Sequence, residues 1–356
     1  MTELYPVIDY LECYKDSKKK MPGLKRQIYV ITGFLGSGKT TLLNHLVNHA
    51  EMNDTAVIIN EFGEVAIDHL LVKSSFEDAV VLKNGCVCCT IKGDLLDTLE
   101  TLAIRQEQGT IPNFSRVVIE TTGLADPAPI LQTLMMEEVI TARYVLSSVV
   151  TTVDGINGLN QLRDVQESVK QAAIADLILL TKTDKTAAPL IEQLLNKLSE
   201  INPSAQIIPL LNGQIDPSII FGRSDFNPEL KQIKVQDWLG RDNNTGSHTP
   251  HKHGGDISTF YITYDEPLPW RAVKVWLQSI ISLRSQDVLR IKGILDLVGF
   301  DKPVVIHGVQ IALHDPAVLD IWPTEERKSI IVFIGRHLVK KEIETALNKL
   351  RAHEAA

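Results

Sequence analysis

Short, nearly continuous apolar runs recur along the N-terminal part of the chain. They cover residues 28–32, 56–59, 79–82, 116–119, 146–150, 177–180 and 206–210. Stretches with helical spacing of apolar residues lie between several of them, including residues 40–50, 92–104 and 164–175. Strands that do not alternate apolar with polar residues are buried on both faces. When such strands are separated by helices along the chain, they predict an α/β fold with a mainly parallel sheet.

The pattern changes after residue 221. Residues 222–255 are polar and contain glycine, which predicts a linker. Beyond them, the hydrophobic pattern predicts strands at 258–264, 288–292, 304–309 and 330–334, and helices at 270–281 and 340–350. We therefore expect an N-terminal extension (1–26), a first domain (27–221), a linker (222–255) and a smaller α+β C-terminal domain (256–356).

Composition excludes several classes of protein. The chain has 356 residues, 44% apolar and 22% charged, as in globular proteins of two domains. A formal net charge of −8 argues against a nucleic-acid partner. No apolar run approaches the roughly 20 residues that span a membrane. Residues 1–21 lack the order of basic, apolar and small residues of a secretory signal, so a cytoplasmic location is expected.

The segment after the first predicted strand, Gly33 to Thr40, reads G-x-x-x-x-G-K-[ST] in full and precedes a predicted helix. Such a loop directs backbone N–H groups at phosphates, so the first domain is expected to be a P-loop NTPase. Lys39 is expected to reach the β- and γ-phosphates, and the Thr40 hydroxyl to bind Mg²⁺. The nucleotide-binding residues predicted in this segment are Gly33, Gly36, Ser37, Gly38, Lys39, Thr40 and Thr41.

A second motif discriminates between GTP and ATP. Thr181, Lys182, Thr183 and Asp184 directly follow the apolar run 177–180 and are similar to the [NT]-K-x-D guanine motif. The Asp184 carboxylate can accept two N–H groups of guanine, whereas adenine offers no such pair of donors. Lys182 can pack its stem along the base. A simple turn at the end of a strand is the alternative interpretation of this tetrapeptide.

Acidic residues at strand ends are further candidates. Glu120 ends the run 116–119 and could hold Mg²⁺, and the backbone N–H of Gly123 could bind the γ-phosphate. Glu61 and Glu64 follow the run 56–59, where a loop that responds to the nucleotide would lie. Either could contact Mg²⁺, orient water or help to ligate a second metal. Each of these carboxylates could equally be a solvated side chain.

Three of the four cysteines form one cluster, Cys86, Cys88 and Cys89, while Cys13 stands apart. Neighbouring cysteines cannot all pair with one another in relaxed geometry, so a disulfide scaffold is not expected. Thiolates on a loop before a helix favour zinc or Cu(I). Redox-active thiols and buried structural cysteines remain alternatives. His248, His251 and His253 could add weak metal ligands or lie in a solvated loop.

Taken together, these motifs resemble the CobW-type metallochaperone GTPases, and within them the YjiA-like branch, where Thr replaces the Asn of the guanine motif. The resemblance includes residues 33–41, 60–64, 86–89, 120–123 and 181–184, and it extends to residues 289–295 and 330–335. It implies that Cys86, Cys88 and Cys89 bind the metal and that Glu64 lies beside it. It also implies that Cys89, Thr90 and Lys92 approach the nucleotide.

The expected function is GTP hydrolysis coupled to delivery of a transition metal, zinc in the first place, to a client metalloprotein. Lys39, Thr40, Glu61 and Glu120 are the predicted catalytic residues. GTP, Mg²⁺ and Zn²⁺ are the expected ligands. Neither nucleic acid nor a membrane is an expected partner. A dimer that forms in response to nucleotide or metal is a possible assembly. A passive GTP- and metal-binding protein and a P-loop small-molecule kinase are the alternatives.

Overall fold

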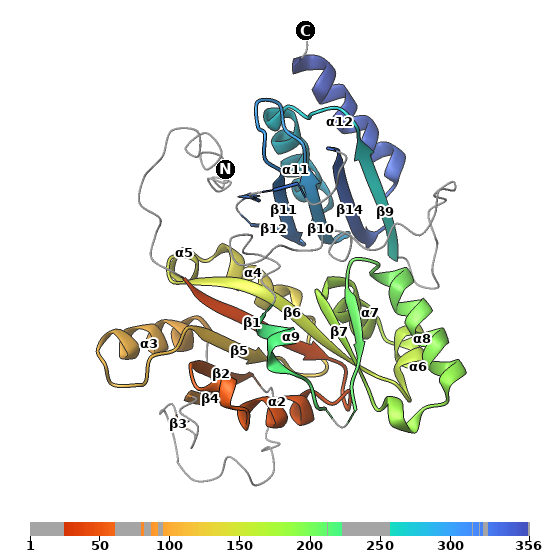
Figure 1. Cartoon of the computed structure of the whole chain (residues 1–356). Helices are drawn as coiled ribbons and strands as arrows, with labels where there is room; N and C mark the ends of the chain where they lie inside the picture. Colours follow the sequence, from red (N-terminus) through yellow and green to blue (C-terminus); the bar gives the residue numbers. More distant parts are fainter. Residues whose placement is uncertain are drawn as a thin grey trace.

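The computed structural model describes residues 25–60, 80–81, 87–91, 95–211, 213–222, 257–314, 316–319, 321–322 and 327–354, with the backbone alone for residues 60, 80–81 and 87–91. Figure 1 shows two sheets, each with its own helices: the first in the red-to-green part of the chain, the second in the blue part. Within the described ranges no helix is long and apolar enough to cross a membrane.

The first domain is built on an eight-stranded sheet with the order β3-β4-β2-β5-β1-β6-β7-β8. Its strands are β1 (Arg26–Gly33), β2 (Thr55–Asn60), β3 (Val80–Val81), β4 (Val87–Ile91), β5 (Arg116–Glu120), β6 (Tyr144–Asp154), β7 (Leu177–Thr181) and β8 (Gln206–Pro209). All neighbouring strands are parallel except β3 and β4. The predicted α/β class is therefore confirmed. The carboxyl ends of the parallel strands lie at one edge of the sheet.

Helices cover both faces of this sheet, because successive strand residues alternate between two cores. Ile28 and Val30 of β1 pack in one core with α3, α4, α7 and α8. Tyr29 and Ile31 pack in the other with α2 and α9. The helices of this domain are α2 (Lys39–Val47), α3 (Leu95–Glu107), α4 (Ala128–Met136), α5 (Glu138–Thr141), α6 (Gly158–Asp164), α7 (Gln166–Ile174), α8 (Ala188–Ile201) and α9 (Pro217–Phe221), with the 3₁₀ turns η1 (Ala50–Met52) and η2 (Thr183–Lys185).

The cysteine segment differs from its prediction. We expected it on a loop before a helix, but Cys88 and Cys89 lie inside β4, which pairs with the outer edge of β2. Val87, Thr90 and Ile91 of this strand are β-branched, and such residues favour a pleated strand where an open edge is available. Of the predicted strand 79–82, the structure describes Val80 and Val81, which form β3 and run antiparallel to β4.

The second domain contains an antiparallel sheet with the order β12-β11-β10-β14-β9, and β13 pairs with β11. Its elements are β9 (Ile257–Tyr264), α11 (Trp270–Arg284), β10 (Val288–Leu295), β11 (Val304–Val309), β12 (Ala312–Leu313), β13 (Ala317–Val318), β14 (Ser329–Arg336) and α12 (Lys340–Glu354). Helices α11 and α12 cover one face, where Trp276 and Phe333 pack edge to face. The other face continues the core of the first domain.

Buried polar contacts join the two domains. Arg290 and Lys292 of β10 both form ion pairs with Asp176, the residue before β7, and Arg290 also donates a hydrogen bond to the Ile174 carbonyl at the end of α7. The side chains of all three charged residues are at most 1% exposed. Thr259 of β9 donates a hydrogen bond to the Ile201 carbonyl at the end of α8. The interface between the domains is thus an apolar core that encloses a buried cluster of charged side chains.

Candidate nucleotide-binding site

The loop between β1 and α2 has a backbone that requires glycine. Gly36 and Gly38 have positive φ angles of 71° and 97°. At Gly33 (φ 141°) a Cβ atom would lie 2.4 Å from the Thr152 carbonyl oxygen of β6. These conformations turn the chain at the carboxyl edge of the sheet and start α2 at Lys39, so that the backbone N–H groups of the first helical turn face outward from this edge.

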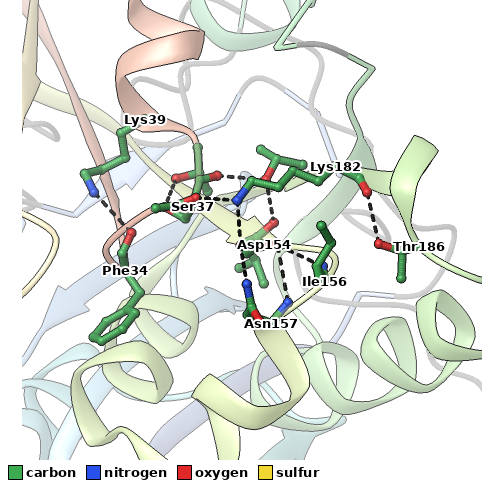
Figure 2. A network of polar contacts seen from close by, with 12 residues as sticks. Phe34, Ser37, Lys39, Asp154, Ile156, Asn157, Lys182 and Thr186 are labelled. Carbon is green, nitrogen blue, oxygen red and sulfur yellow. Dashed lines mark hydrogen bonds and ion pairs between the residues drawn. The ribbon is translucent and has the colours of Figure 1, made fainter. Parts of the chain in front are cut away.

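Lys39 lies over this loop. Its ammonium donates hydrogen bonds to the carbonyls of Gly33 (2.8 Å) and Phe34 (3.2 Å), and the residue is 8% exposed. Figure 2 shows the side chain extending back from α2 toward Phe34. A buried ammonium beside a helix N-terminus adds positive charge where that terminus already favours an anion.

Thr40 and Glu120 come together at the same edge. The Thr40 hydroxyl lies 3.4 Å from Oε1 of Glu120, which ends β5 next to β1 and is 5% exposed. A hydroxyl and a carboxylate in contact supply the hard oxygen ligands that Mg²⁺ prefers. The two side chains therefore fit a magnesium ion.

The loop after β5 packs on the phosphate-binding loop. A Cβ atom on Gly123 would lie 2.7 Å from the backbone nitrogen of Leu35, so only glycine permits this approach. Gln171 of α7 donates hydrogen bonds to the carbonyls of Gly123 (3.3 Å) and Ala125 (3.2 Å). Gly123 is thus held beside the P-loop, where the sequence predicts its contact with the γ-phosphate.

The turn after β7 is joined to the phosphate-binding loop by two side chains. The Thr181 hydroxyl contacts the Ser37 carbonyl at 2.8 Å and the Val153 carbonyl at 3.2 Å. Lys182 donates a hydrogen bond to the Gly36 carbonyl at 2.8 Å. Thr181 therefore joins the two loops directly. Asp184, in η2, is exposed and accessible to a base.

Two features of this site were missed from the sequence. Asp154, at the end of β6, accepts a hydrogen bond from Lys182 at 2.7 Å. An acid at the end of a parallel strand is the pattern that identified Glu120, but the predicted run 146–150 stopped four residues before Asp154, so this pattern did not reveal it. The loop after β8 also lies at the site: the Thr183 hydroxyl donates a hydrogen bond to the Leu210 carbonyl, and a Cβ atom on Gly213 would meet Thr41 at 2.9 Å. No motif in the sequence indicates that loop.

Several predicted residues lie wholly or partly outside the described part of the chain. The structure describes neither the backbone nor the side chain of Glu61, Glu64, Cys86, Lys92, His248, His251 and His253, and it describes only the backbone of Cys88, Cys89 and Thr90. The backbone of β4 runs parallel to β2, with Thr90 opposite Ile59, and Ile59 in turn opposite Glu120 of β5. Thr90 is therefore level with the edge that carries Glu120. In the described ranges no three His, Cys, Asp or Glu side chains form a group that could hold a metal.

A parallel sheet whose first strand leads through a glycine loop into a helix, with lysine and threonine at the helix start, defines the class of P-loop NTPases. The family model "CobW/HypB/UreG, nucleotide-binding domain" matches residues 27–209, and the model "Cobalamin synthesis protein cobW C-terminal domain" matches residues 257–351. The chain belongs to the CobW family, as the resemblance of its motifs predicts.

Individual relatives agree with this assignment over nearly the whole chain. The zinc chaperone YjiA of Escherichia coli is 35% identical over 91% of this chain and 98% of its own length. The zinc chaperone CobW of Pseudomonas aeruginosa is 28% identical over 91% of this chain and 92% of its own. The crystal structure of Zn(II)-bound YjiA GTPase from E. coli superimposes with a TM-score of 0.69, at 33% identity, covering 92% of this chain and 99% of that one.

Proposed function

We propose that this protein is a GTP-hydrolysing metallochaperone that binds zinc and delivers it to a client protein. The observation that carries the proposal is the direct connection between the turn 181–184 and the phosphate-binding loop, through Thr181 and Lys182. This connection supports a guanine site, with Asp184 as its carboxylate, at a fixed distance from the phosphate site. The similarity to zinc chaperones over nine tenths of the chain supports the metal part of the function.

Each part of the nucleotide has a proposed partner. Asp184 accepts the N–H groups of guanine, and Lys39 with the N-terminus of α2 binds the phosphates. Thr40 and Glu120 hold Mg²⁺, which when bound neutralises charge that develops on the phosphates. Gly123, held by Gln171, offers its backbone N–H to the γ-phosphate. Removal of that phosphate frees the loop after β5 from this contact.

Metal binding is proposed for Cys86, Cys88 and Cys89, with Glu64 as a further ligand. The parallel pairing of β4 with β2 supports a connection to the nucleotide, because it extends the cysteine strand toward the edge that carries Glu120. Glu61, Cys89, Thr90 and Lys92 remain proposed neighbours of the nucleotide. His248, His251 and His253 remain proposed auxiliary ligands.

The second domain is proposed to contact the client, since its outer helices and strand ends are not required by the nucleotide site. A cytoplasmic location, the absence of nucleic-acid and membrane partners, and dimerisation that depends on nucleotide or metal are further parts of the proposal.

Competition between nucleotides tests the guanine assignment. GTP and GDP, but not ATP, should displace a fluorescent GDP analogue from the wild-type protein. Asp184→Asn should weaken GTP binding at least tenfold and improve binding of xanthosine triphosphate, because the amide offers a donor where xanthine presents a carbonyl. Equal displacement by ATP would instead favour a small-molecule kinase.

A further inference from the structure

Asp154 occupies a buried position between the phosphate-binding loop and the turn 181–184, which we call the guanine turn. Its side chain is 2% exposed. One carboxylate oxygen, Oδ1, accepts hydrogen bonds from the backbone N–H groups of Ile156 (2.8 Å) and Asn157 (3.3 Å). The other, Oδ2, accepts from the Asn157 side chain (3.1 Å) and from the Lys182 ammonium (2.7 Å). The carboxylate thus forms a local turn with one oxygen and a long-range ion pair with the other (Figure 2).

Lys182 depends on this partner for its position. Its backbone has φ 55°, in the left-handed region that is unfavourable for a non-glycine residue. Its ammonium lies between the Asp154 carboxylate and the Gly36 carbonyl of the phosphate-binding loop. Figure 2 shows this bridge, which crosses from β7 to the loop before α2. A strained backbone persists where its surroundings determine it, and here the ion pair is part of those surroundings.

We propose that Asp154 is a positioning residue for guanine nucleotide binding: by holding Lys182 against Gly36, it sets the guanine turn at the correct distance from the phosphate-binding loop. The inference rests on the proposed function, because the turn positioned in this way is the one that binds guanine. Asp154 itself lies beneath the turn and acts through Lys182.

The charge of Asp154 is essential to this role. Burial raises the pKa of its carboxyl, but hydrogen bonds from Lys182, Asn157 and two backbone N–H groups outweigh burial and hold the pKa below its usual value. An asparagine at this position has a single side-chain oxygen. If that oxygen accepts from the backbone N–H groups, the NH2 group faces the Lys182 ammonium as a second donor. If the oxygen faces Lys182, it is neutral and the NH2 group opposes the backbone N–H groups.

A double-mutant cycle between Asp154 and Lys182 tests the inference. The variants are Asp154→Asn, Lys182→Met and the double variant, and the measurement is the dissociation constant of GDP and of a non-hydrolysable GTP analogue with Mg²⁺. Each single variant should raise both dissociation constants about tenfold or more. The double variant should bind no more weakly than Lys182→Met alone, because the two residues act as one unit.

Asn157→Ala is the matched control. It removes one hydrogen bond to Asp154 but leaves both the charge of Asp154 and its pair with Lys182, so affinity should change less than about twofold. A loss equal to that of Asp154→Asn would mean that the local turn, and not the ion pair, is required. Additive effects of Asp154→Asn and Lys182→Met would overturn the inference in the same way.

Thermal unfolding gives an independent readout. Lys182→Met leaves the Asp154 charge buried without its ion partner, so adding Asp154→Asn to it should raise the midpoint of unfolding. If the double variant unfolds at a lower temperature than Lys182→Met, or does not fold, Asp154 serves the fold and the inference is wrong. Wild-type protein that binds no guanine nucleotide would instead refute the proposed function.

Discussion

At the scale of single residues, the substitution of threonine for asparagine in the guanine motif has a structural explanation. Thr181 is 6% exposed, and its hydroxyl lies within hydrogen-bonding distance of two carbonyls, one on the phosphate-binding loop and one on β6. A Cβ atom on Gly38 would lie 3.3 Å from the Thr181 methyl group, so that this methyl also packs on the loop. A short β-branched hydroxyl residue therefore connects the two loops across a small gap.

Replacing Thr181 with valine should separate the hydroxyl from the shape of the side chain. The change leaves the buried carbonyls of Ser37 and Val153 without this donor, so the free energy of unfolding should fall by about 1–3 kcal/mol. GDP affinity should fall with it, because the turn loses one of its two contacts with the loop and keeps only that of Lys182. Urea denaturation and GDP titration measure the two effects. Thr181→Ser is the control: recovery of both properties by serine is expected, and its failure would assign the effect to packing of the methyl group.

At the scale of elements, α7 connects the nucleotide site with the second domain. Gln171, which is 1% exposed, contacts the loop that carries Gly123, and Lys170 forms an ion pair with Asp126 of the same loop. At the C-terminal end of the helix, within one turn of Gln171, Arg290 of β10 donates a hydrogen bond to the Ile174 carbonyl. The same short helix therefore contacts both the loop beside the P-loop and the second domain.

Gln171→Leu should reduce GTP hydrolysis more than it reduces GDP affinity. The leucine removes the donor to Gly123 and Ala125, so the loop proposed to meet the γ-phosphate loses its support, whereas the proposed contacts of the base and of the α- and β-phosphates are retained. We expect kcat to fall about tenfold and the GDP dissociation constant to change less than threefold, from single-turnover hydrolysis and fluorescence titration. Gln166→Leu, at the first position of the same helix, is the control. Equal losses in kcat and GDP affinity would show a general loosening of the site.

Most elements were predictable because each has a local pattern. The apolar runs of β1, β2, β5 and β7 and the glycines before α2 are determined by residues close in sequence. β6 extends past the predicted run 146–150, because the hydroxyl groups of Thr151 and Thr152 donate hydrogen bonds to carbonyls inside the fold. β4 depends on the free edge of β2, and the role of Asp154 depends on Lys182, which is distant in sequence. Such long-range contacts leave no local pattern.

At the scale of the whole molecule, the two domains share one core and a buried charged cluster. Asp176 faces Arg290 and Lys292, and His307 of β11 lies near both cations. Burial raises the pKa of the Asp176 carboxyl, but the charges of Arg290 and Lys292 and its hydrogen bonds hold it below its usual value. Burial, Arg290 and Lys292 lower the pKa of His307 well below 6.5, and similar causes lower that of His314 to about 3. The domains should therefore unfold together.

The histidines at this interface predict the dependence of stability on pH. A group with a folded pKa below its unfolded pKa takes up its proton in the unfolded chain first, so stability falls as the pH drops below about 6.5. Each such histidine contributes a slope of about 1.4 kcal/mol per pH unit below that value. His307→Gln should reduce the slope of the unfolding free energy against pH between pH 6 and pH 4.5 by the contribution of about one proton. Urea denaturation at several pH values measures this slope. His353→Gln, in the exposed last turn of α12, is the matched substitution against which this change in slope is compared. An unchanged slope in His307→Gln would contradict the buried, neutral state of this histidine.

The proposed function requires nucleotide binding and zinc binding to be coupled in one chain. Zinc affinity, measured by competition with a chelating probe with and without Mg²⁺ and a non-hydrolysable GTP analogue, tests this coupling. We predict that the analogue changes zinc affinity at least fivefold, that zinc changes the affinity for the analogue by the same factor, and that both effects disappear when Cys86, Cys88 and Cys89 are replaced by serine. Zinc affinity that is equal with and without the nucleotide would contradict the account and leave a GTP-binding protein whose metal site is independent of it.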